Sequence, residues 1–111
     1  MVLSVLNFMN QKVFFSLCFF CCSGASLLAS HVGERLYMQK CSHCHGLKGE
    51  QSVFETSAVI QGWQIDKTLQ ALHGYKDHSY GSTKKGVMKV IVARMDEKSI
   101  EDVATYIENL K

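Results

Sequence analysis

This chain of 111 residues has a low net charge, few cysteine pairs and little of the alternation between apolar and polar residues that is typical of strands. Twelve lysine and arginine residues against ten acidic residues leave a net charge of only +2. The basic residues are spread along the chain and form no phosphate-binding stripe, which excludes a nucleic-acid-binding protein. No segment alternates apolar and polar residues over the length of a strand, so the sequence predicts an all-α fold.

The first thirty residues, 1–30, differ in character from the rest. A single positive charge at Lys12 precedes an uncharged stretch from Val13 to Ser30, which ends in small residues. This order is typical of a secretory signal peptide, and the alternative is an uncleaved membrane anchor. Cleavage after Ala25, Ser26 or Ser30 fits the small-residue end. We therefore predict an export segment at 1–30 and one folded domain at 31–111.

Three of the five cysteines lie in the export segment, so Cys41 and Cys44 alone remain in the predicted domain. They stand in the stretch CSHCHG, with an imidazole directly after the second thiol. A structural zinc site needs four ligands, and drawing the missing two from His73 and His78 matches no common zinc spacing. A thioredoxin-like pair follows a strand in a βαβ pattern, which this sequence lacks. The remaining interpretation is covalent attachment of c-type haem, for which C-x-x-C-H is the direct signature.

Haem attachment explains the spacing of the motif. Two thiols about one helical turn apart can each add to one porphyrin vinyl group, and the next side chain then lies under the iron. We therefore predict that Cys41 and Cys44 form thioethers and that His45 is the proximal axial ligand. Gly46 lets the backbone turn away close to the ring. A bound haem also supplies the apolar body that a chain of about eighty residues needs to complete its core.

The second axial ligand decides the function, because an open haem face binds oxygen or peroxide, whereas a capped haem transfers electrons. The candidates are His73, His78, Met88 and Met95. Met88 is preferred, since it follows the flexible stretch GSTKKGV, which can bring a thioether over the distal face. Met95, next to the cap of the last helix, is interpreted as a core residue. The two histidines are interpreted as surface or capping residues.

Helical periodicity begins at Val32 and continues into the cysteine motif, and a loop is predicted from Gly46 to Ser57. A middle helix starts near Ile65, with Asp66 as a possible cap and Gly74 as its end. The stretch 76–86 is rich in turn residues, and the apolar run 87–95 fits a helix or a strand. The clearest helix follows Asp96 as its cap. Its apolar stripe consists of Ile100, Val103, Ala104, Ile107 and Leu110.

Several of these stretches also carry a family resemblance. They are Gly33 and Tyr37 before the cysteine motif, GW at 62–63, LHGYKDHSYG at 72–81, KKGVMKVIVARM around Met88 and IEDVATYIENL near the end. On these stretches the chain from Val32 to Lys111 resembles the class I cytochromes c, in particular the short, single-haem bacterial type. The resemblance implies three to five helices wrapped around one covalently bound haem c, with Met88 as the sixth ligand. It also implies that Gly33 and Tyr37 pack against the last helix at Val103 and Tyr106.

The resemblance implies a soluble periplasmic electron carrier rather than an enzyme. Such a carrier moves electrons between periplasmic or membrane respiratory enzymes, for example to a terminal oxidase or a peroxidase, and docks on these larger redox proteins transiently. One alternative is a haem enzyme or gas sensor with five-coordinate haem, in which Met88 only packs. Another is a membrane-anchored carrier that retains residues 1–30.

One departure from the family pattern concerns proline. Many relatives carry a proline whose carbonyl accepts the ring N–H of the proximal histidine, and here Val59 and Ile60 stand at the matching place. A backbone carbonyl needs no proline side chain, so we still expect this hydrogen bond to His45.

Two groups of side chains are candidates for a secondary role. Trp63, Tyr75 and Tyr80 are candidates for contacts with the haem or its propionates, with core packing as the alternative. Lys84, Lys85 and Lys89 are candidates for a basic rim that attracts an acidic partner, with solvated loop lysines as the alternative.

Overall fold

The computed structural model describes residues 24–53, 57–81 and 86–111, and within these ranges it contains five helices and no strand. The helices are α2 (Gly24–Lys40), α3 (Ser42–His45), α4 (Ile65–Lys76), α5 (Gly86–Ala93) and α6 (Glu97–Glu108). The predicted all-α fold is confirmed. Most of the predicted export segment, residues 1–23, lies outside the described ranges. Among the described helices, none has the length and apolar character needed to cross a membrane.

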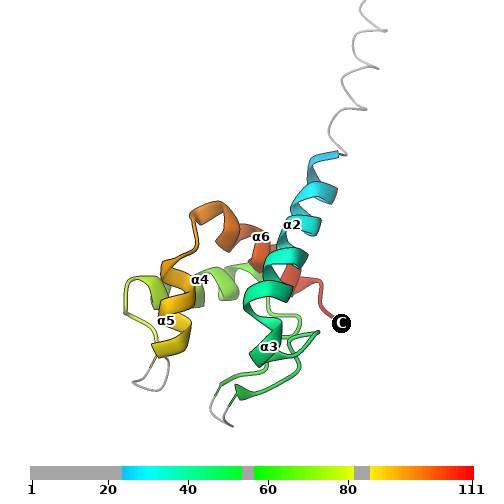
Figure 1. The fold of residues 1–111 in the computed structure, drawn as a ribbon. Coiled ribbons are helices and arrows are strands. Elements are labelled where there is room, and N and C mark those ends of the chain that lie inside the picture. The colour runs from blue at the N-terminus through cyan, green and yellow to red at the C-terminus, as the bar shows by residue number, and fades with distance from the viewer. Residues whose placement is uncertain (1–23, 54–56, 82–85) are drawn as a thin grey trace, which may run out of the picture.

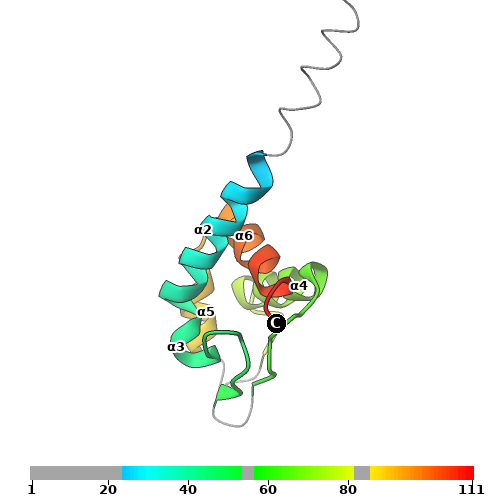
Figure 2. The same ribbon diagram turned by 90° about the vertical axis from the view of Figure 1, so that its right-hand side faces the viewer.

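Helices α2 and α6 cross and pack against each other (Figure 1, Figure 2). They approach closely at Gly33, where an added Cβ would lie 2.2 Å from the carbonyl oxygen of Asp102 and 3.0 Å from the Cβ of Tyr106. Tyr37, one turn further along α2, is fully buried, and its ring centroid lies 5.4 Å from that of Tyr106. The predicted packing against the last helix is therefore confirmed, although Asp102 rather than Val103 lies nearest to Gly33.

Helix α6 follows its local sequence signals. Asp96 is the N-cap, and its carboxylate accepts a hydrogen bond of 2.8 Å from the backbone N–H of Ser99. The predicted stripe is buried throughout, at Ile100, Val103, Ala104, Ile107 and Leu110. These residues form much of the core, which also includes Tyr37 and Val92.

Helix α4 differs from the prediction at both ends. Gln64 is the N-cap, whereas Asp66 lies within the first turn. The helix continues through Gly74 and ends at Lys76. Gly74 serves packing instead of termination, because an added Cβ would lie 2.5 Å from the Cβ of Tyr80 in the chain that turns back.

The other predicted segments are found with the following bounds and contacts. Helix α2 begins at Gly24, earlier than the predicted start at Val32. The apolar run that periodicity left open between helix and strand is helix α5, which packs against α4. The described part of the predicted loop, 46–53 and Ser57, is free of α-helix. In Figure 1, α4 and α5 lie across from α3, and α6 passes behind α2.

Candidate functional site

A cavity of about 240 Å³ lies between α3, α4, α5 and the loop after α3. It is several times larger than the roughly 30 Å³ that one water molecule occupies in the liquid, so it is more than a packing gap. Apolar and aromatic side chains make up most of its wall. The polar residues that line it are Lys40, Cys41, Cys44, His45, Ser57 and Thr68.

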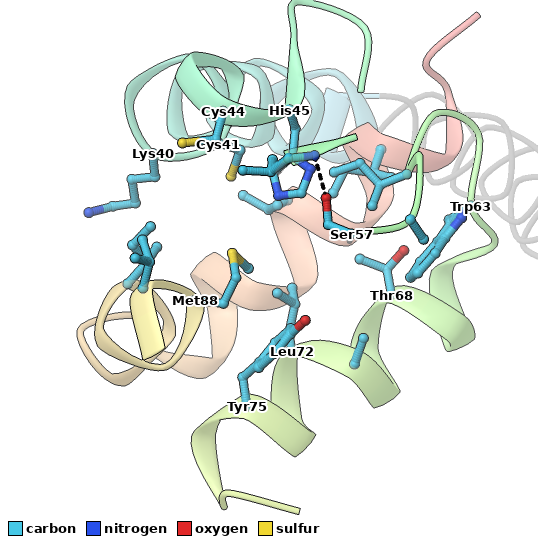
Figure 3. Close-up of a pocket in the computed structure, with 18 of the residues that line it drawn as sticks. Lys40, Cys41, Cys44, His45, Ser57, Trp63, Thr68, Leu72, Tyr75 and Met88 are labelled. Atoms are coloured by element: carbon cyan, nitrogen blue, oxygen red, sulfur yellow. Dashed lines mark hydrogen bonds between the residues drawn. The ribbon is translucent and has the colours of Figure 1, made fainter. Parts of the chain in front are cut away.

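The short helix α3 brings the cysteine motif to this cavity. The backbone N–H of His45 donates to the carbonyl of Cys41 at 2.9 Å, and that of Gly46 donates to Ser42 at 2.9 Å, which closes one helical turn. Cys41 and Cys44 therefore lie one turn apart, and both line the cavity. Figure 3 shows His45 pointing into the same space. The structure thus brings together the three residues that the motif predicts.

The His45 imidazole is held in a buried environment. The residue is 8% exposed, and burial lowers the pKa of its imidazole, which favours the neutral form that can ligate a metal. Its Nδ1 has no hydrogen-bond partner in the part of the chain that the structure describes. The predicted hydrogen bond from the His45 ring to a carbonyl of Val59 or Ile60 is therefore not found, and that prediction is wrong. The carbonyl of Ile60 instead accepts the N–H of Trp63 at 3.1 Å, which closes a local turn.

Met88, at the start of α5, lines the cavity and points into it from the side opposite His45 (Figure 3). The other three candidates for the second ligand lie elsewhere. Met95 is 5% exposed and belongs to the core, as predicted. His73 is hydrogen-bonded to Glu97, and His78 is exposed in a turn with φ of 67°. Of the four candidates, Met88 alone lies in the wall of the cavity.

The two thiols are free and differ in exposure. Cys44 is exposed, whereas Cys41 is half-buried. Burial raises the pKa of the Cys41 thiol to about 11, an effect that neighbouring Cys44 adds to and Lys40 opposes. Cys41 therefore stays a protonated thiol at neutral pH.

The three aromatic candidates all line the cavity. Tyr75 and Tyr80 form an edge-to-face pair with ring centroids 5.0 Å apart. The Nζ of Lys67 lies 3.8 Å from the centroid of the Trp63 ring, a cation–π distance. In Figure 3, Trp63 and Thr68 stand at the end of the cavity away from the cysteines. The cavity therefore has one end lined by the two thiols and an opposite end lined by Trp63 and Thr68.

Sequence reasoning missed part of the wall. It gave bounds for the middle helix but did not identify the face that lines the cavity, which consists of Thr68, Ala71, Leu72 and Tyr75. The spacing i, i+3, i+4 and i+7 was the signal for this face, and the small residues within it leave room for a bound group.

The lysine prediction is only partly testable. Lys84 and Lys85 lie outside the described residues, and Lys89 is described but does not line the cavity. Lys40, which was not singled out, reaches its wall instead. Figure 3 shows the Lys40 side chain extending away from the centre of the cavity.

The donor set fits a covalently attached haem. Two thiols at one end, a neutral imidazole on one side and a thioether on the other surround an apolar space. Thioether tethers with histidine and methionine axial ligands are the set found in c-type electron-transfer proteins. The described residues contain no cluster of three or more metal-binding side chains that would favour a different metal centre.

Comparison with known proteins gives the same result. The family model described as "Cytochrome c" matches residues 30–111. The chain is 32% identical over 98 residues to cytochrome c-553 of Nitratidesulfovibrio vulgaris (strain DSM 19637 / Miyazaki F), an alignment that covers 88% of this chain and 95% of that relative. It is 34% identical over 76 residues to cytochrome c-553 of Desulfomicrobium norvegicum (strain DSM 1741 / NCIMB 8310), covering 68% of this chain and 92% of the relative. A cytochrome c-554(547) of Halothiobacillus neapolitanus is 27% identical over 85 residues, covering 71% and 93%.

Proposed function

Because this chain belongs to the cytochrome c family, whose members carry covalently bound haem c and transport electrons, we propose that it is an exported single-haem electron carrier. In this proposal, Cys41 and Cys44 tether the haem, and His45 and Met88 are the axial ligands of its iron. The observation that carries the proposal is the convergence of these four side chains on one apolar cavity.

The bound haem would supply one-electron exchange between ferrous and ferric iron. The chain's own residues prepare the cavity for it. Burial keeps His45 neutral, so that a nitrogen lone pair is available, and the thioether of Met88 favours a raised reduction potential. The apolar wall, which includes Leu72 and Ile91, excludes water from the cavity. With both axial positions filled, no site is left for a substrate, so catalysis in the strict sense is not proposed.

We further propose that the carrier docks briefly on larger redox proteins that give and accept electrons, such as a terminal oxidase or a peroxidase. Two apolar residues at the cavity, Val87 and Tyr80, are 61% and 37% exposed and offer a small contact surface. Lys40 adds positive charge to the same region. An acidic partner would therefore associate faster at low ionic strength.

The proposed location is the periplasm, after removal of residues 1–30. This rests on the signal-like order of the N-terminal sequence and on the fact that c-type haem is attached outside the cytoplasm. A carrier that retains the segment as an anchor is the second choice. Mass spectrometry of the mature N-terminus separates the two, because cleavage near Ala25, Ser26 or Ser30 removes a defined mass.

The absorption spectrum of the oxidised protein tests the central proposal. Protein matured in a host that attaches c-type haem should show a weak near-infrared band from sulfur-to-iron ligation, together with a low-spin signal. Its intact mass should equal the polypeptide plus one haem. A high-spin spectrum without that band would favour a five-coordinate haem enzyme or gas sensor. A colourless protein with the mass of bare polypeptide would contradict haem binding altogether.

A further inference from the structure

The hydroxyl of Tyr37 makes a contact that packing alone does not require. The side chain is fully buried in the crossing of α2 and α6. Its hydroxyl donates a hydrogen bond of 2.8 Å to the carbonyl of Gly46, nine residues further along the chain. Gly46 directly follows His45, the proposed axial ligand. The core of the molecule is thus joined to the backbone that carries this ligand.

The other hydrogen bonds around His45 come from its immediate surroundings. Its N–H donates to Cys41 and its carbonyl accepts from the N–H of Gln51, both at 2.9 Å. These bonds fix the shape of the short helix and of the loop that follows. They lie within this one segment, so they do not fix its position relative to the crossing of α2 and α6. The Tyr37 hydroxyl comes from the last turn of α2, where its ring packs on Tyr106 of α6, so its bond places α3 and the loop relative to the packed helices.

The imidazole itself lacks the contact that normally orients a metal-bound histidine. Such a ring usually donates its second N–H to a carbonyl or carboxylate. Within the described ranges, Nδ1 of His45 has no partner. Helix α3 has only four residues and no side-chain cap. The direction of the imidazole therefore depends on how firmly its backbone is held.

We propose that Tyr37 is a positioning residue for the axial ligand: its hydroxyl, through the carbonyl of Gly46, fixes the placement and plane of the His45 imidazole under the haem iron. The inference rests on the proposed function, since it assumes that His45 binds this iron. Burial raises the pKa of Tyr37, so the phenol is protonated and able to donate at neutral pH. Tyr37 is therefore both a packing residue and a support for the ligand.

Tyr106 provides a matched control. Its ring faces Tyr37 in the same aromatic pair, and its hydroxyl makes no hydrogen bond to the described residues around His45. Tyr37→Phe and Tyr106→Phe thus remove the same atom from the two partners of one ring pair. A difference between the two variants reports the bond to Gly46 and not the loss of a hydroxyl from the crossing.

The experiment compares the wild type with both variants as purified holoproteins. Intact mass first establishes the covalent haem in each protein. Amide hydrogen exchange at His45 and Gly46 is then measured, together with the midpoint potential and the spread of the haem methyl NMR shifts, which depends on the plane of the axial imidazole. In Tyr37→Phe we expect exchange about tenfold faster at these two amides, as for the loss of one buried hydrogen bond. We also expect a shifted potential and an altered methyl spread, whereas Tyr106→Phe should match the wild type.

The other possible results distinguish a failure of the proposed function from a failure of the positioning role. A wild type without covalent haem contradicts the proposed function. A haem-loaded Tyr37→Phe variant that equals Tyr106→Phe in all three measurements overturns only the positioning role. If Tyr37→Phe yields no holoprotein, 3-fluorotyrosine at position 37 keeps the ring and the hydroxyl but makes the phenol a stronger donor. The methyl spread should then change for the label at position 37 and stay unchanged for the same label at position 106, and equal spectra would overturn the proposal.

Discussion

The imidazole of His73 on α4 is hydrogen-bonded to the carboxylate of Glu97 in the first turn of α6. This contact lies on the surface, with side-chain exposures of 43% and 60%. It joins the end of one helix to the start of another and takes no part in the cavity. His73, one of the four candidates for the second iron ligand, is therefore a surface residue, as the sequence analysis predicted.

His73→Ala should consequently leave the haem spectrum unchanged. The near-infrared band and the midpoint potential are expected to equal those of the wild type, because the residue does not line the cavity. The free energy of unfolding should fall by no more than about 1 kcal/mol, as is usual for an exposed pair. Denaturant titration gives the second quantity. Loss of the low-spin spectrum in this variant would mean that His73, and not Met88, binds the iron.

The close crossing at Gly33 predicts a strong effect for one added methyl group. In Gly33→Ala, the new Cβ would lie 2.2 Å from the carbonyl oxygen of Asp102, so α2 and α6 must separate. We expect a loss of about 1 to 3 kcal/mol, as for other overpacked sites, measured by denaturant unfolding. Gly86→Ala is the matched control, since no atom of the described residues lies within 4 Å of its added Cβ. The control should be neutral or slightly stabilising, and equal losses in both variants would contradict the proposed role of the crossing.

The cap of α6 predicts a stability change that depends on pH. Hydrogen bonds from the side chain and the backbone N–H of Ser99 lower the pKa of Asp96. A lowered folded-state pKa means that the contribution is fully present above the unfolded pKa of about 3.9 and is lost as the pH falls through the folded value. Asp96→Ala should therefore lower the melting temperature by several degrees at neutral pH. The difference from the wild type should shrink as the pH falls below about 4.

Two further variants sharpen that test. Asp96→Asn keeps an oxygen that can accept the Ser99 N–H but removes the titrating charge, so its deficit should lack the acid dependence. Asp66→Ala removes a carboxylate from the first turn of α4, where Gln64 is the cap, and should have the smaller effect. If the Asp96→Ala deficit stays constant down to pH 2, the titration of this cap does not contribute to stability.

The features that were predictable from sequence are those encoded locally. The cap at Asp96 and the stripe from Ile100 to Leu110 are signals within one helix, and both are found as expected. The order of Cys41, Cys44 and His45 likewise dictates that one helical turn presents all three to the same space. Such patterns need no knowledge of the rest of the fold.

The features that were missed depend on distant segments. Gly74 resembles a helix end in sequence, yet its lack of a side chain is required by Tyr80, which returns against it only in the folded chain. A carbonyl near Val59 and Ile60 was expected to accept from His45, but within the described residues Nδ1 of His45 has no partner, and the carbonyl of Ile60 accepts from Trp63 in a local turn. The periodicity of apolar residues does not indicate which hydrogen bonds the backbone of a loop will make. These choices are made by tertiary contacts.

The proposed function depends on Met88 as the second axial ligand, so replacement of this residue tests it most directly. Met88→Ala should abolish the sulfur-to-iron band and lower the midpoint potential, because methionine ligation raises it. Met95→Leu is the control, since it replaces a buried core methionine with a side chain of similar volume. That change should cost less than about 1.5 kcal/mol of stability and leave spectrum and potential unchanged. Retention of the band and the potential in Met88→Ala, with helical circular dichroism intact, would show that another side chain caps the iron.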